Sequence, residues 1–585
     1  MPTITVPVLI IGGGGCGLSS SLFLSDLGVE HLLVERHAGT SILPKAHYLN
    51  QRTMEIFRQH DLADAVYEVG APLEHFGQIR WVTSLGGDGP LDGREIHRLD
   101  AFGGGALRSR YEADGPVLAT NYPQLRLEPL LRAEAERRAP GKIRYSHEVT
   151  SWEQQDDGVL VHVLDRATGD ELTVHARYVI VADGGKTVGP ASGVTMEGPT
   201  GMVDMVSTHF SADLSEYWDD NTLITWFSNP EGVSSWQAGA LVQVGPTWGR
   251  NSEEWVIHFA FRPDDPERFN EEAIIPRLRE LLRLPELEVE VHKVSHWILD
   301  RIVADKWRVG DMFLAGDAAH RQPPTTGLGL NTGIQDAHNL TWKLAQVLAG
   351  TATDALLDTY EHERKPVATE VADWALMAFN HDLIDAGIGL VAAAPVEANR
   401  AAFHALFSEG LLGEARRERA RHAIDLQKFE FQAHDLELGY HYTSASVVPD
   451  GTDPAPRSAT GDIYHPTSRP GHLLPHAWLD ADGRRVSTHD LVGGDGAFAL
   501  IAGSDAGPWI AAASTAAQEY GIRIEPVRLG VDALDAEGRW AEIGEIGATG
   551  AILVRPDNHV AWRASGPAAD AERVLVEAVG TVLCR

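Results

Sequence analysis

Cysteine is scarce in this chain: only Cys16 and Cys584 occur among 585 residues. Two cysteines this far apart exclude a disulfide framework and a cysteine-based metal cluster, so we expect no metal site. Basic residues are also few, with 49 Lys and Arg against 83 Asp and Glu and a formal net charge of −34. Nucleic acids and anionic membranes bind basic surfaces, and we therefore expect neither as a partner.

Long apolar runs are missing too. No run approaches the roughly 20 apolar residues that a membrane-spanning helix needs. The apolar N-terminal stretch has no basic segment before it and leads directly into glycines, which is typical of a buried strand and not of a signal peptide. Hydrophobic residues make up 43% of the chain, as in ordinary globular proteins. We expect a cytoplasmic protein of two or three domains, because 585 residues exceed one hydrophobic core.

Glycines gather directly after the first strand. Residues 6–11 form a buried apolar run, and the pattern G-x-G-x-x-G follows it before a helical segment. The next apolar run, residues 32–34, ends at Glu35. In this setting the glycines admit a pyrophosphate at a helix N-terminus, and Glu35 accepts a hydrogen bond from an adenosine ribose. A carboxylate there favours FAD or NAD over a 2′-phosphate; the alternative is a glycine-rich turn without a ligand. The expected binding residues are Gly12, Gly14, Gly15, Cys16, Gly17, Glu35 and Arg36.

A second strand–loop–helix unit spans residues 313–350. A short apolar run ends at a Gly-Asp turn, and a loop rich in proline and glycine leads into a helix that begins near Leu330 or Asn331. The first N–H groups of such a helix lack intrahelical partners and favour an anionic group. Gly327 and Gly329 allow a flat ligand to approach the main chain, and Asp317 can accept hydrogen bonds from sugar or polyol hydroxyls. The alternative is an ordinary connection between a strand and a helix.

This second unit reads G-D-A-A-H-x-x-x-P-x-x-G-x-G-x-N, which resembles the second flavin motif of the class A FAD-dependent aromatic hydroxylases, the para-hydroxybenzoate and phenol hydroxylase group. The resemblance implies that Asp317 binds the ribitol chain of FAD. It also implies that the backbone at Leu330 and Asn331 meets the pyrimidine edge of the isoalloxazine, with Pro323 and Pro324 beside the ring.

Residues 41–58 resemble the segment that passes under the flavin in these hydroxylases. Arg52 begins an R-T-x-E sequence like that of phenol hydroxylase-like members, which implies a contact with FAD; a salt-bridged residue at a helix start is the alternative. His47 stands five residues earlier, at the spacing where phenol hydroxylase carries an acid–base Asp. A histidine suits that role because its pKa lies near neutrality. The alternative for His47 is a solvated side chain.

Two further segments resemble family motifs. Gln124, in the segment 123–132, corresponds to a glutamine that contacts FAD. Asp183 begins the third motif, D-G-x-x-S-x-V-R, and is expected to bind the cofactor. Here Thr187 replaces the serine, and Gly-Pro at 189–190 replaces Val-Arg. The family arginine is associated with the nicotinamide cofactor, so this departure leaves the binding mode of NAD(P)H open.

Tryptophans recur through residues 202–298, where apolar and polar residues alternate as in the strands of a sheet. A tryptophan-rich face can line a pocket for a flat apolar ring, and Trp226 and Trp236 are the candidates. Packing in the core is the alternative for several of these tryptophans. His209 is a candidate polar group of the same pocket.

The resemblance predicts an α/β fold with three parts. A Rossmann-like FAD-binding domain takes residues 1–190 together with 300–440, and an inserted antiparallel-sheet domain for the substrate takes residues 191–299. A linker rich in Pro, Gly and Asp covers residues 441–470, and a thioredoxin-like domain takes residues 471–585. That last domain lacks C-x-x-C, so we expect it to mediate self-association as a dimer or higher homo-oligomer, not redox exchange.

The implied activity is that of a single-component FAD-dependent monooxygenase. It would hydroxylate a phenol-like or heteroaromatic ring with NAD(P)H and O₂, through a flavin C4a-hydroperoxide. The chemistry requires fixed donors at the flavin edge, a base for the phenolic proton, and exclusion of water. The alternatives are a flavin-dependent dehydrogenase or reductase without oxygen transfer, a flavin-bound interaction protein, and a polyketide-tailoring hydroxylase. The W-x-W-x-I-P sequence expected of a halogenase is absent.

Overall fold

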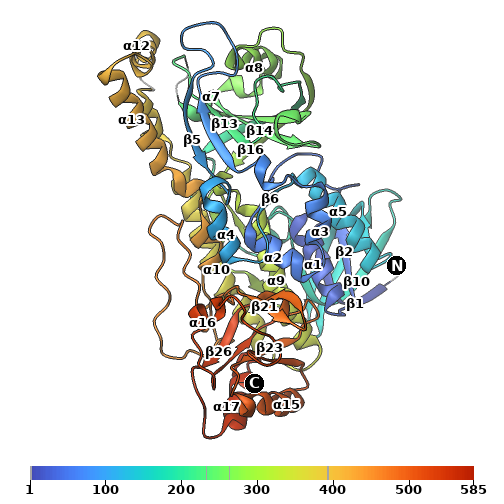
Figure 1. Ribbon diagram of the computed structural model, residues 1–585. Helices are drawn as coiled ribbons and strands as arrows, with labels where there is room; N and C mark the ends of the chain where they lie inside the picture. Colours follow the sequence, from blue (N-terminus) through green and yellow to red (C-terminus); the bar gives the residue numbers. More distant parts are fainter. Residues whose placement is uncertain (1–2, 232–233, 262–263, 392–393) are drawn as a thin grey trace.

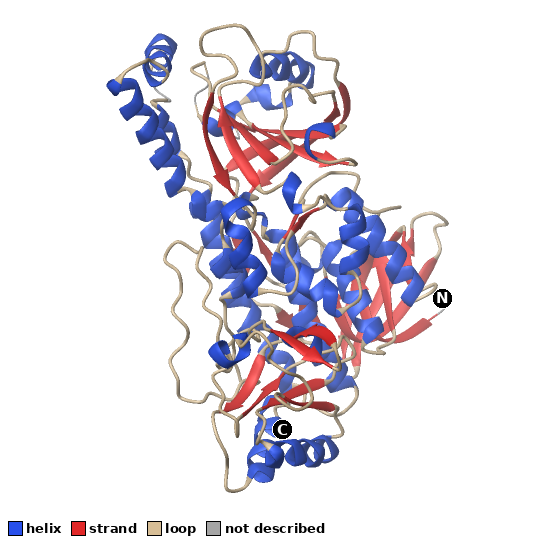
Figure 2. Ribbon diagram, in the orientation of Figure 1, coloured by secondary structure: helices blue, strands red, loops and turns tan. Residues whose placement is uncertain are grey.

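The computed structural model describes residues 3–231, 234–261, 264–391 and 394–585 (Figure 1). Three large sheets lie in this part of the chain, with helices packed between and around them (Figure 2). We call them the central sheet, the upper sheet and the C-terminal sheet. Within the described residues, none of the helices combines the length and the hydropathy needed to cross a membrane.

The central sheet has eight strands, of which six follow the order β18-β19-β10-β1-β2-β7, with β9 and β8 paired beyond β10. Strand β10 is parallel to β1 and β19, and β1 is parallel to β2. The carboxyl ends of these four strands therefore meet at one edge, where α/β sheets bind their ligands. The strands are β1 (Thr3–Ile11), β2 (His31–Glu35), β7 (Ile143–Tyr145), β8 (His147–Gln155), β9 (Gly158–Asp165), β10 (Glu171–Val181), β18 (Arg308–Val309) and β19 (Met312–Leu314).

Helices cover the central sheet, and the apolar side chains between the helices and the sheet form a hydrophobic core. Helix α1 packs against both α5 and α9, and α9 packs against α10. Pro366 lies inside α10. The helices of this part are α1 (Gly15–Asp26), α2 (Gln51–Gln59), α3 (Ala63–Val69), α4 (Arg108–Asp114), α5 (Gln124–Arg138), α6 (Val188–Ala191), α9 (Gly329–Leu348) and α10 (Ala355–Ala378). A short antiparallel pair, β3 (Tyr48–Leu49) with β6 (Thr120–Asn121), lies between α2 and the upper sheet.

The upper sheet has seven strands in the order β16-β12-β15-β14-β13-β4-β5. We expected this sheet within residues 191–299, and that boundary was too narrow. Strand β13 pairs in parallel with β4, which carries β5 beside it, so two strands come from the N-terminal third of the chain. The strands are β4 (Gln78–Val82), β5 (Glu95–Asp100), β12 (Val203–Ser211), β13 (Thr222–Phe227), β14 (Ala240–Gly245), β15 (Glu254–Phe261) and β16 (Glu290–Leu299).

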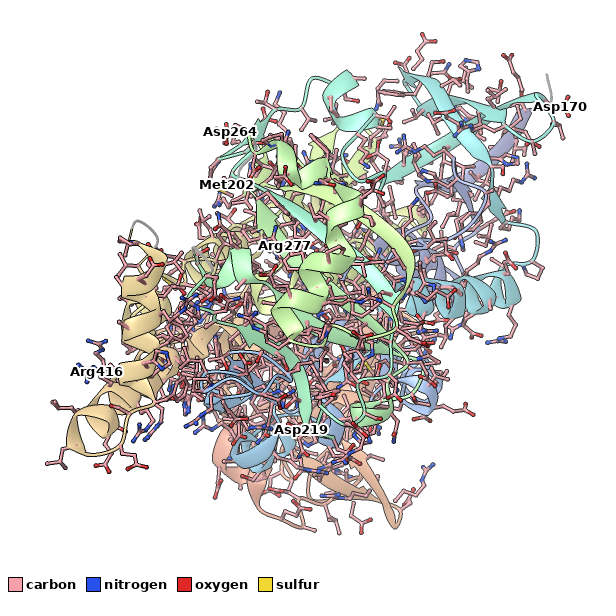
Figure 3. The ribbon with its side chains drawn as sticks, turned by 90° about the horizontal axis from the view of Figure 1, so that it is seen from above. Asp170, Met202, Asp219, Asp264, Arg277 and Arg416 are labelled. Atoms are coloured by element: carbon pink, nitrogen blue, oxygen red, sulfur yellow. The ribbon has the colours of Figure 1, made fainter. Side chains whose placement is uncertain are left out.

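The two faces of the upper sheet have different neighbours, because successive side chains of a strand point to opposite faces. Phe210 and Trp255 pack with Leu278 of α8 (Ile274–Leu282) in one apolar cluster. Arg277 of the same helix, labelled in Figure 3, donates to the main chain of α7 (Ser235–Ala238) at the Gln237 oxygen, 2.7 Å away. The opposite face, which carries Trp226, therefore turns toward the central part of the molecule.

Helices α11, α12, α13 and α14 follow α10 in the chain, and α12 and α13 lie beside the upper sheet (Figure 1). Helix α13 contacts α11, α12 and β5. These helices are α11 (Asp382–Ile388), α12 (Val396–Leu406), α13 (Leu411–Leu426) and α14 (His434–Leu438).

The C-terminal sheet follows a long irregular stretch that includes the expected linker. Its order is β24-β23-β25-β26, with β23 and β24 parallel and the other pairs antiparallel. Helices α15 and α17 pack against each other beside it. The elements are β21 (Trp478–Ala481), β22 (Arg484–Ser487), β23 (Phe498–Ala502), α15 (Gly507–Tyr520), β24 (Ile524–Arg528), α16 (Arg539–Ile543), β25 (Ala551–Val554), β26 (Val560–Ala564) and α17 (Ala571–Val582).

Candidate active site

The first glycine loop lies tightly between β1 and β10. Gly12 has φ +113°, and a Cβ there would stand 2.2 Å from the carbonyl oxygen of Ala182. A Cβ on Gly17 would stand 2.0 Å from the carbonyl oxygen of Gly12. Helix α1 has no side-chain cap, so its first N–H groups are available to a ligand. At the end of β2, Glu35 accepts a hydrogen bond from the Gly13 N–H at 2.8 Å, which brings the carboxylate to the same loop.

The second loop meets the first one at the edge of the central sheet. A Cβ on Gly316 would lie 3.2 Å from the Cβ of Cys16. Asp317 is exposed although Gly316 and Ala318 beside it are buried. In the part of the chain that the structure describes, the Asp317 carboxylate accepts no hydrogen bond. It is therefore open to an external donor, as a ribitol-binding carboxylate must be.

The start of α9 presents backbone donors. The first intrahelical bond runs from the Thr332 N–H to the Leu328 carbonyl at 2.8 Å, so the N–H groups of residues 329–331 have no acceptor within the helix. The side chain of Asn331 has a different task. It accepts from the Asn50 N–H and donates to the Tyr48 carbonyl, both at 2.9 Å, and thereby fixes the segment that carries His47.

Gln322 tests whether a flavin fits this loop. Its amide Nε2 and Oε1 are both buried, and neither has a hydrogen-bond partner within the described structure. A Cβ on Gly329 would lie 3.9 Å from the Gln322 Nε2, so the amide stands beside the open N–H groups of α9. A polar heteroaromatic edge would satisfy both sets of groups. With the glycine loop and Asp317, the residues present fit FAD.

The other predicted cofactor residues differ in their hydrogen-bond partners and in their exposure. Gln124 donates to Glu128 at 2.5 Å, and Glu128 lies beside Gly14, so Gln124 is linked to the first loop only through Glu128. Asp183 is used within the chain: its oxygens accept from the N–H groups of residues 185, 187 and 188 and cap α6. Arg36 is half-buried beside Glu35, Pro323 is buried and Pro324 is exposed.

Arg52 forms an ion pair with Glu55 at the start of α2, which is the alternative that the sequence analysis gave to a contact with FAD. Its guanidinium donates to Glu55 at 3.1 Å and to the Asp557 carbonyl at 2.9 Å, and only 1% of the residue is exposed. Asp557 lies next to the C-terminal sheet. Arg52 therefore joins α2 to the C-terminal part, because a buried guanidinium needs acceptors and finds them inside the protein.

His47 lies directly before β3 and is half-buried. Its Nδ1 is 2.7 Å from the Asn121 Oδ1. Since an amide oxygen only accepts, Nδ1 carries the proton and Nε2 has a free lone pair. Burial lowers the pKa of His47, and the bond to Asn121 offsets part of that change. The ring is thus neutral at physiological pH, with Nε2 ready to take a proton.

Of the three candidates for the substrate pocket, Trp226 lies on the inward face of the upper sheet, in a cluster with Tyr48 and Leu328. Trp236 packs edge-on against Trp226 and donates to the Phe379 carbonyl at 2.9 Å, which is a core role. His209 is buried and bonds Glu254 at 2.8 Å.

The same Glu254 oxygen accepts from Arg126 at 2.8 Å. His209, Glu254 and His292 bring ligand atoms within 4.8 Å of one another, but the guanidinium of Arg126 already neutralises the carboxylate.

Residues that the sequence did not single out complete this region. Asn121 orients His47, and Glu437 accepts from the Tyr48 hydroxyl at 3.0 Å, while burial raises the pKa of Glu437 to about 8. His258 lies on the inward face of the upper sheet. No local sequence pattern predicts these residues. Asn121 and Glu437 each bond a residue more than 70 positions away, and His258 bonds Ser207 on the neighbouring strand. Two surface hollows of about 890 and 850 Å³ lie elsewhere, along α10 and beside α4, and no predicted site residue lines them.

Known proteins resemble this chain along most of its length. A family model described as FAD binding domain matches residues 5–375, and one described as aromatic-ring hydroxylase, C-terminal, matches residues 467–585. Tetracenomycin A2 monooxygenase-dioxygenase of Streptomyces glaucescens is 37% identical over 600 residues, covering 100% of this chain and 98% of the relative. The 2,4-dichlorophenol 6-monooxygenase of Delftia acidovorans is 35% identical over 569 residues, covering 96% and 95%.

Solved structures extend the likeness to three dimensions. The flavin-dependent monooxygenase PieE, in complex with FAD and substrate, superposes with a TM-score of 0.92 at 36% identity, over 100% of both chains. Aklavinone-11 hydroxylase with FAD and aklavinone gives a TM-score of 0.81 at 31% identity, again over 100% of both chains. Relatives of matching length and a family model over more than half the residues lead to one conclusion: the chain belongs to the class A FAD-dependent aromatic hydroxylases and is an FAD-dependent monooxygenase.

Proposed function

We propose that this enzyme hydroxylates a phenolic ring held between FAD and the inward face of the upper sheet, with His47 taking the phenolic proton. The observation that carries the proposal is the bond from the His47 Nδ1 to Asn121, which leaves Nε2 as the acceptor. When bound, FAD supplies reduction by NAD(P)H and the activation of O₂. A phenolate is a stronger nucleophile than a phenol, so a positioned base raises the reactivity of the ring.

The surroundings supply the other requirements of this chemistry. Trp81, Trp226 and Val242 lie in one apolar cluster with Leu328, the residue just before α9. An apolar environment of this kind excludes water from the reacting groups. The open N–H groups at the start of α9 would hold negative charge at the flavin edge. Asp317 and the glycine loop would hold the ribitol and pyrophosphate parts of FAD.

The size of the substrate distinguishes two candidates. The relative from Delftia is named for dichlorophenol, while the solved neighbour with a TM-score of 0.81 holds aklavinone. We therefore retain a polyketide-tailoring hydroxylase as the second candidate beside a simple phenol or heteroaromatic hydroxylase. A screen that includes one-ring phenols, hydroxypyridines and multi-ring polyphenols separates them.

We expect a true substrate to stimulate NADH or NADPH oxidation and to consume O₂. The assay measures nicotinamide oxidation, O₂ uptake and product together, with ¹⁸O₂ to follow the oxygen atom. Label in the product marks a monooxygenase. Nicotinamide oxidation that proceeds without O₂ uptake, at any member of the panel, would instead indicate a flavin-dependent dehydrogenase or reductase.

Asp317→Ala should weaken FAD binding. Loss of a hydrogen bond to a charged acceptor costs on the order of 1.5–3 kcal/mol, which corresponds to roughly a tenfold or larger loss of affinity. FAD retained after dialysis, read from the flavin absorbance per protein, measures the effect. Asp170→Ala, at the hairpin tip labelled in Figure 3, is the matched control and should retain FAD like the wild type. Equal retention in both variants would contradict the assignment of Asp317.

We further infer that residues 471–585 form a thioredoxin-like domain. The strand order β24-β23-β25-β26, with β23 and β24 parallel and connected through α15, supports this arrangement. We also propose residues 1–190 with 300–440 as the FAD-binding part, and a homo-oligomer in solution. Strands β4 and β5 belong to the upper sheet in this division.

A further inference from the structure

A second histidine lies near His47 on the inward face of the upper sheet. His258 pairs in register with Ser207 of β12 on one side and with Ala240 of β14 on the other. Ala240 belongs to the apolar cluster that contains Trp226, Tyr48 and Leu328. Tyr48 directly follows His47 in the chain, and Leu328 directly precedes α9. His258 therefore borders the region that the proposed function assigns to the substrate.

His258 is close to His47 in space as well. Burial, helped by the nearby His47, lowers the pKa of His258 to about 3. The side chain is nevertheless half-buried, not sealed in the core. A neutral imidazole at a partly open position on this face can form a hydrogen bond with a ligand.

The hydrogen bonds of His258 define which ring nitrogen carries the proton. Its Nδ1 lies 2.8 Å from the hydroxyl oxygen of Ser207. That oxygen also accepts the indole N–H of Trp297, likewise at 2.8 Å. The Ser207 hydroxyl hydrogen has no other acceptor among the described contacts, so it donates to the His258 Nδ1. A neutral ring that accepts at Nδ1 carries its hydrogen at Nε2 and is a donor there.

The two histidines therefore have complementary roles at neutral pH. His47 accepts at Nε2, because its Nδ1 donates to Asn121. His258 donates at Nε2, because its Nδ1 accepts from Ser207. A phenolic oxygen that loses its proton needs such a pair, one group to receive the proton and one to hold the negative charge.

We propose that His258 contacts the substrate and donates its Nε2–H to the phenolic oxygen that gives its proton to His47. The phenolic O–H bond breaks, an N–H bond forms at His47, and the charge left on oxygen faces His258. Ser207 and Trp297 are positioning residues, because they hold the tautomer of His258 without touching the ring. This inference rests on the proposed function and names a second substrate-binding side chain for it.

The experiment follows the ionisation of a bound phenol, not turnover. The FAD-loaded enzyme is titrated with 4-nitrophenol over a range of pH, and difference absorbance gives the phenolate fraction of the bound probe. In the wild type the bound probe should ionise at a lower pH than the free probe. His258→Phe should raise the neutral-to-phenolate ratio about tenfold or more, as expected when a hydrogen bond to a charged group is lost. His258→Gln, which keeps an N–H donor, should recover much of the effect.

Matched variants separate a contact with the probe from a structural role. Ser211 and His292 form a second Ser–His pair, 2.7 Å apart, between β12 and its other neighbour β16, where His292 is exposed. His292→Phe should leave the phenolate fraction unchanged. Ser207→Ala keeps the His258 ring but releases its tautomer, and should shift the ratio in the same direction as His258→Phe. This variant tests the proposal if His258→Phe loses FAD or fails to fold.

The outcomes distinguish the inference from the function on which it rests. If His258→Phe and Ser207→Ala bind the probe with the phenolate fraction of the wild type, His258 does not contact the phenolic oxygen. The same conclusion follows if the wild type binds only the neutral probe while substrates are still hydroxylated, and the proposed function then stands. If no phenol binds or stimulates O₂ uptake, the proposed function fails and His258 has no phenol to hold.

Discussion

His47→Ala should lower the hydroxylation rate by roughly 10²–10⁴-fold, the range for a lost general base. FAD should stay bound, because His47 lies outside both glycine-rich loops and its ring bonds Asn121, not a loop residue. Nicotinamide oxidation should fall less than product formation. The difference should emerge as H₂O₂, since a neutral phenol ring accepts the activated oxygen slowly. Product, H₂O₂ and nicotinamide oxidation are measured together for the wild type and the variant.

The control for this substitution is His147→Ala. That histidine is half-buried at the start of β8, and its Nδ1 lies 2.8 Å from the Tyr145 carbonyl oxygen. It should retain the rate and coupling of the wild type. Equal product rates and equal coupling in His47→Ala would show that His47 is a bystander and that another group takes the proton.

The pH profile provides a second check on His47. A base must be neutral to act, and burial lowers the pKa of His47 below the ordinary histidine value. The rate should therefore be constant through neutral pH and should fall only on the acid side of about 6.5. His47→Ala should lack this acid limb. A wild-type rate that already falls between pH 8 and 7 would assign the profile to a different group.

Much of the cofactor site could be predicted from the sequence because its signals are local. The run of glycines after β1, the acid at the end of β2 and the Gly-Asp turn after β19 each stand beside their own strand. Parallel strands then bring these three segments to one edge of the sheet without further information. The start of α9 was predicted near Leu330 or Asn331 and lies at Gly329, one or two residues away.

The remainder depends on contacts between distant segments. Strands β4 and β5 join the upper sheet through one parallel pairing of β4 with β13. No pattern within either strand predicts that pairing. Arg52 turned out to bond Asp557, 505 positions away, so its place in an R-T-x-E sequence could not decide between FAD and a buried ion pair. His258 is one histidine among 26, and only its register against Ser207 leads to the role proposed for it.

Buried charges join the C-terminal part to the FAD-binding part. Arg555 donates to both carboxylate oxygens of Glu363, at 2.6 and 2.9 Å, and to Asp557 at 3.0 and 2.5 Å. Lys343 donates to Glu363 at 2.6 Å. These side chains are at most 2% exposed. Burial alone would raise the pKa of Glu363, but Arg555 and Lys343 outweigh it and hold the pKa below its usual range.

Arg555→Leu should destabilise the protein by about 3–5 kcal/mol, because it leaves two buried carboxylates with one cation between them. The midpoint of urea unfolding at pH 7 measures the loss. Arg573→Leu, which removes an exposed ion pair with Glu577 on α17, is the control and should cost about 0–1 kcal/mol.

The pH dependence of the stability loss in Arg555→Leu tests the mechanism. Glu363 has a depressed pKa, so its pairing stabilises the fold above the unfolded value of about 4.3 and is lost as the pH falls further. The deficit of Arg555→Leu should therefore shrink toward pH 4, where the orphaned carboxyls can take up protons. A deficit equal to that of the control, or one that does not change with pH, would mean that solvent reaches these groups and that their charges do not hold the two parts together.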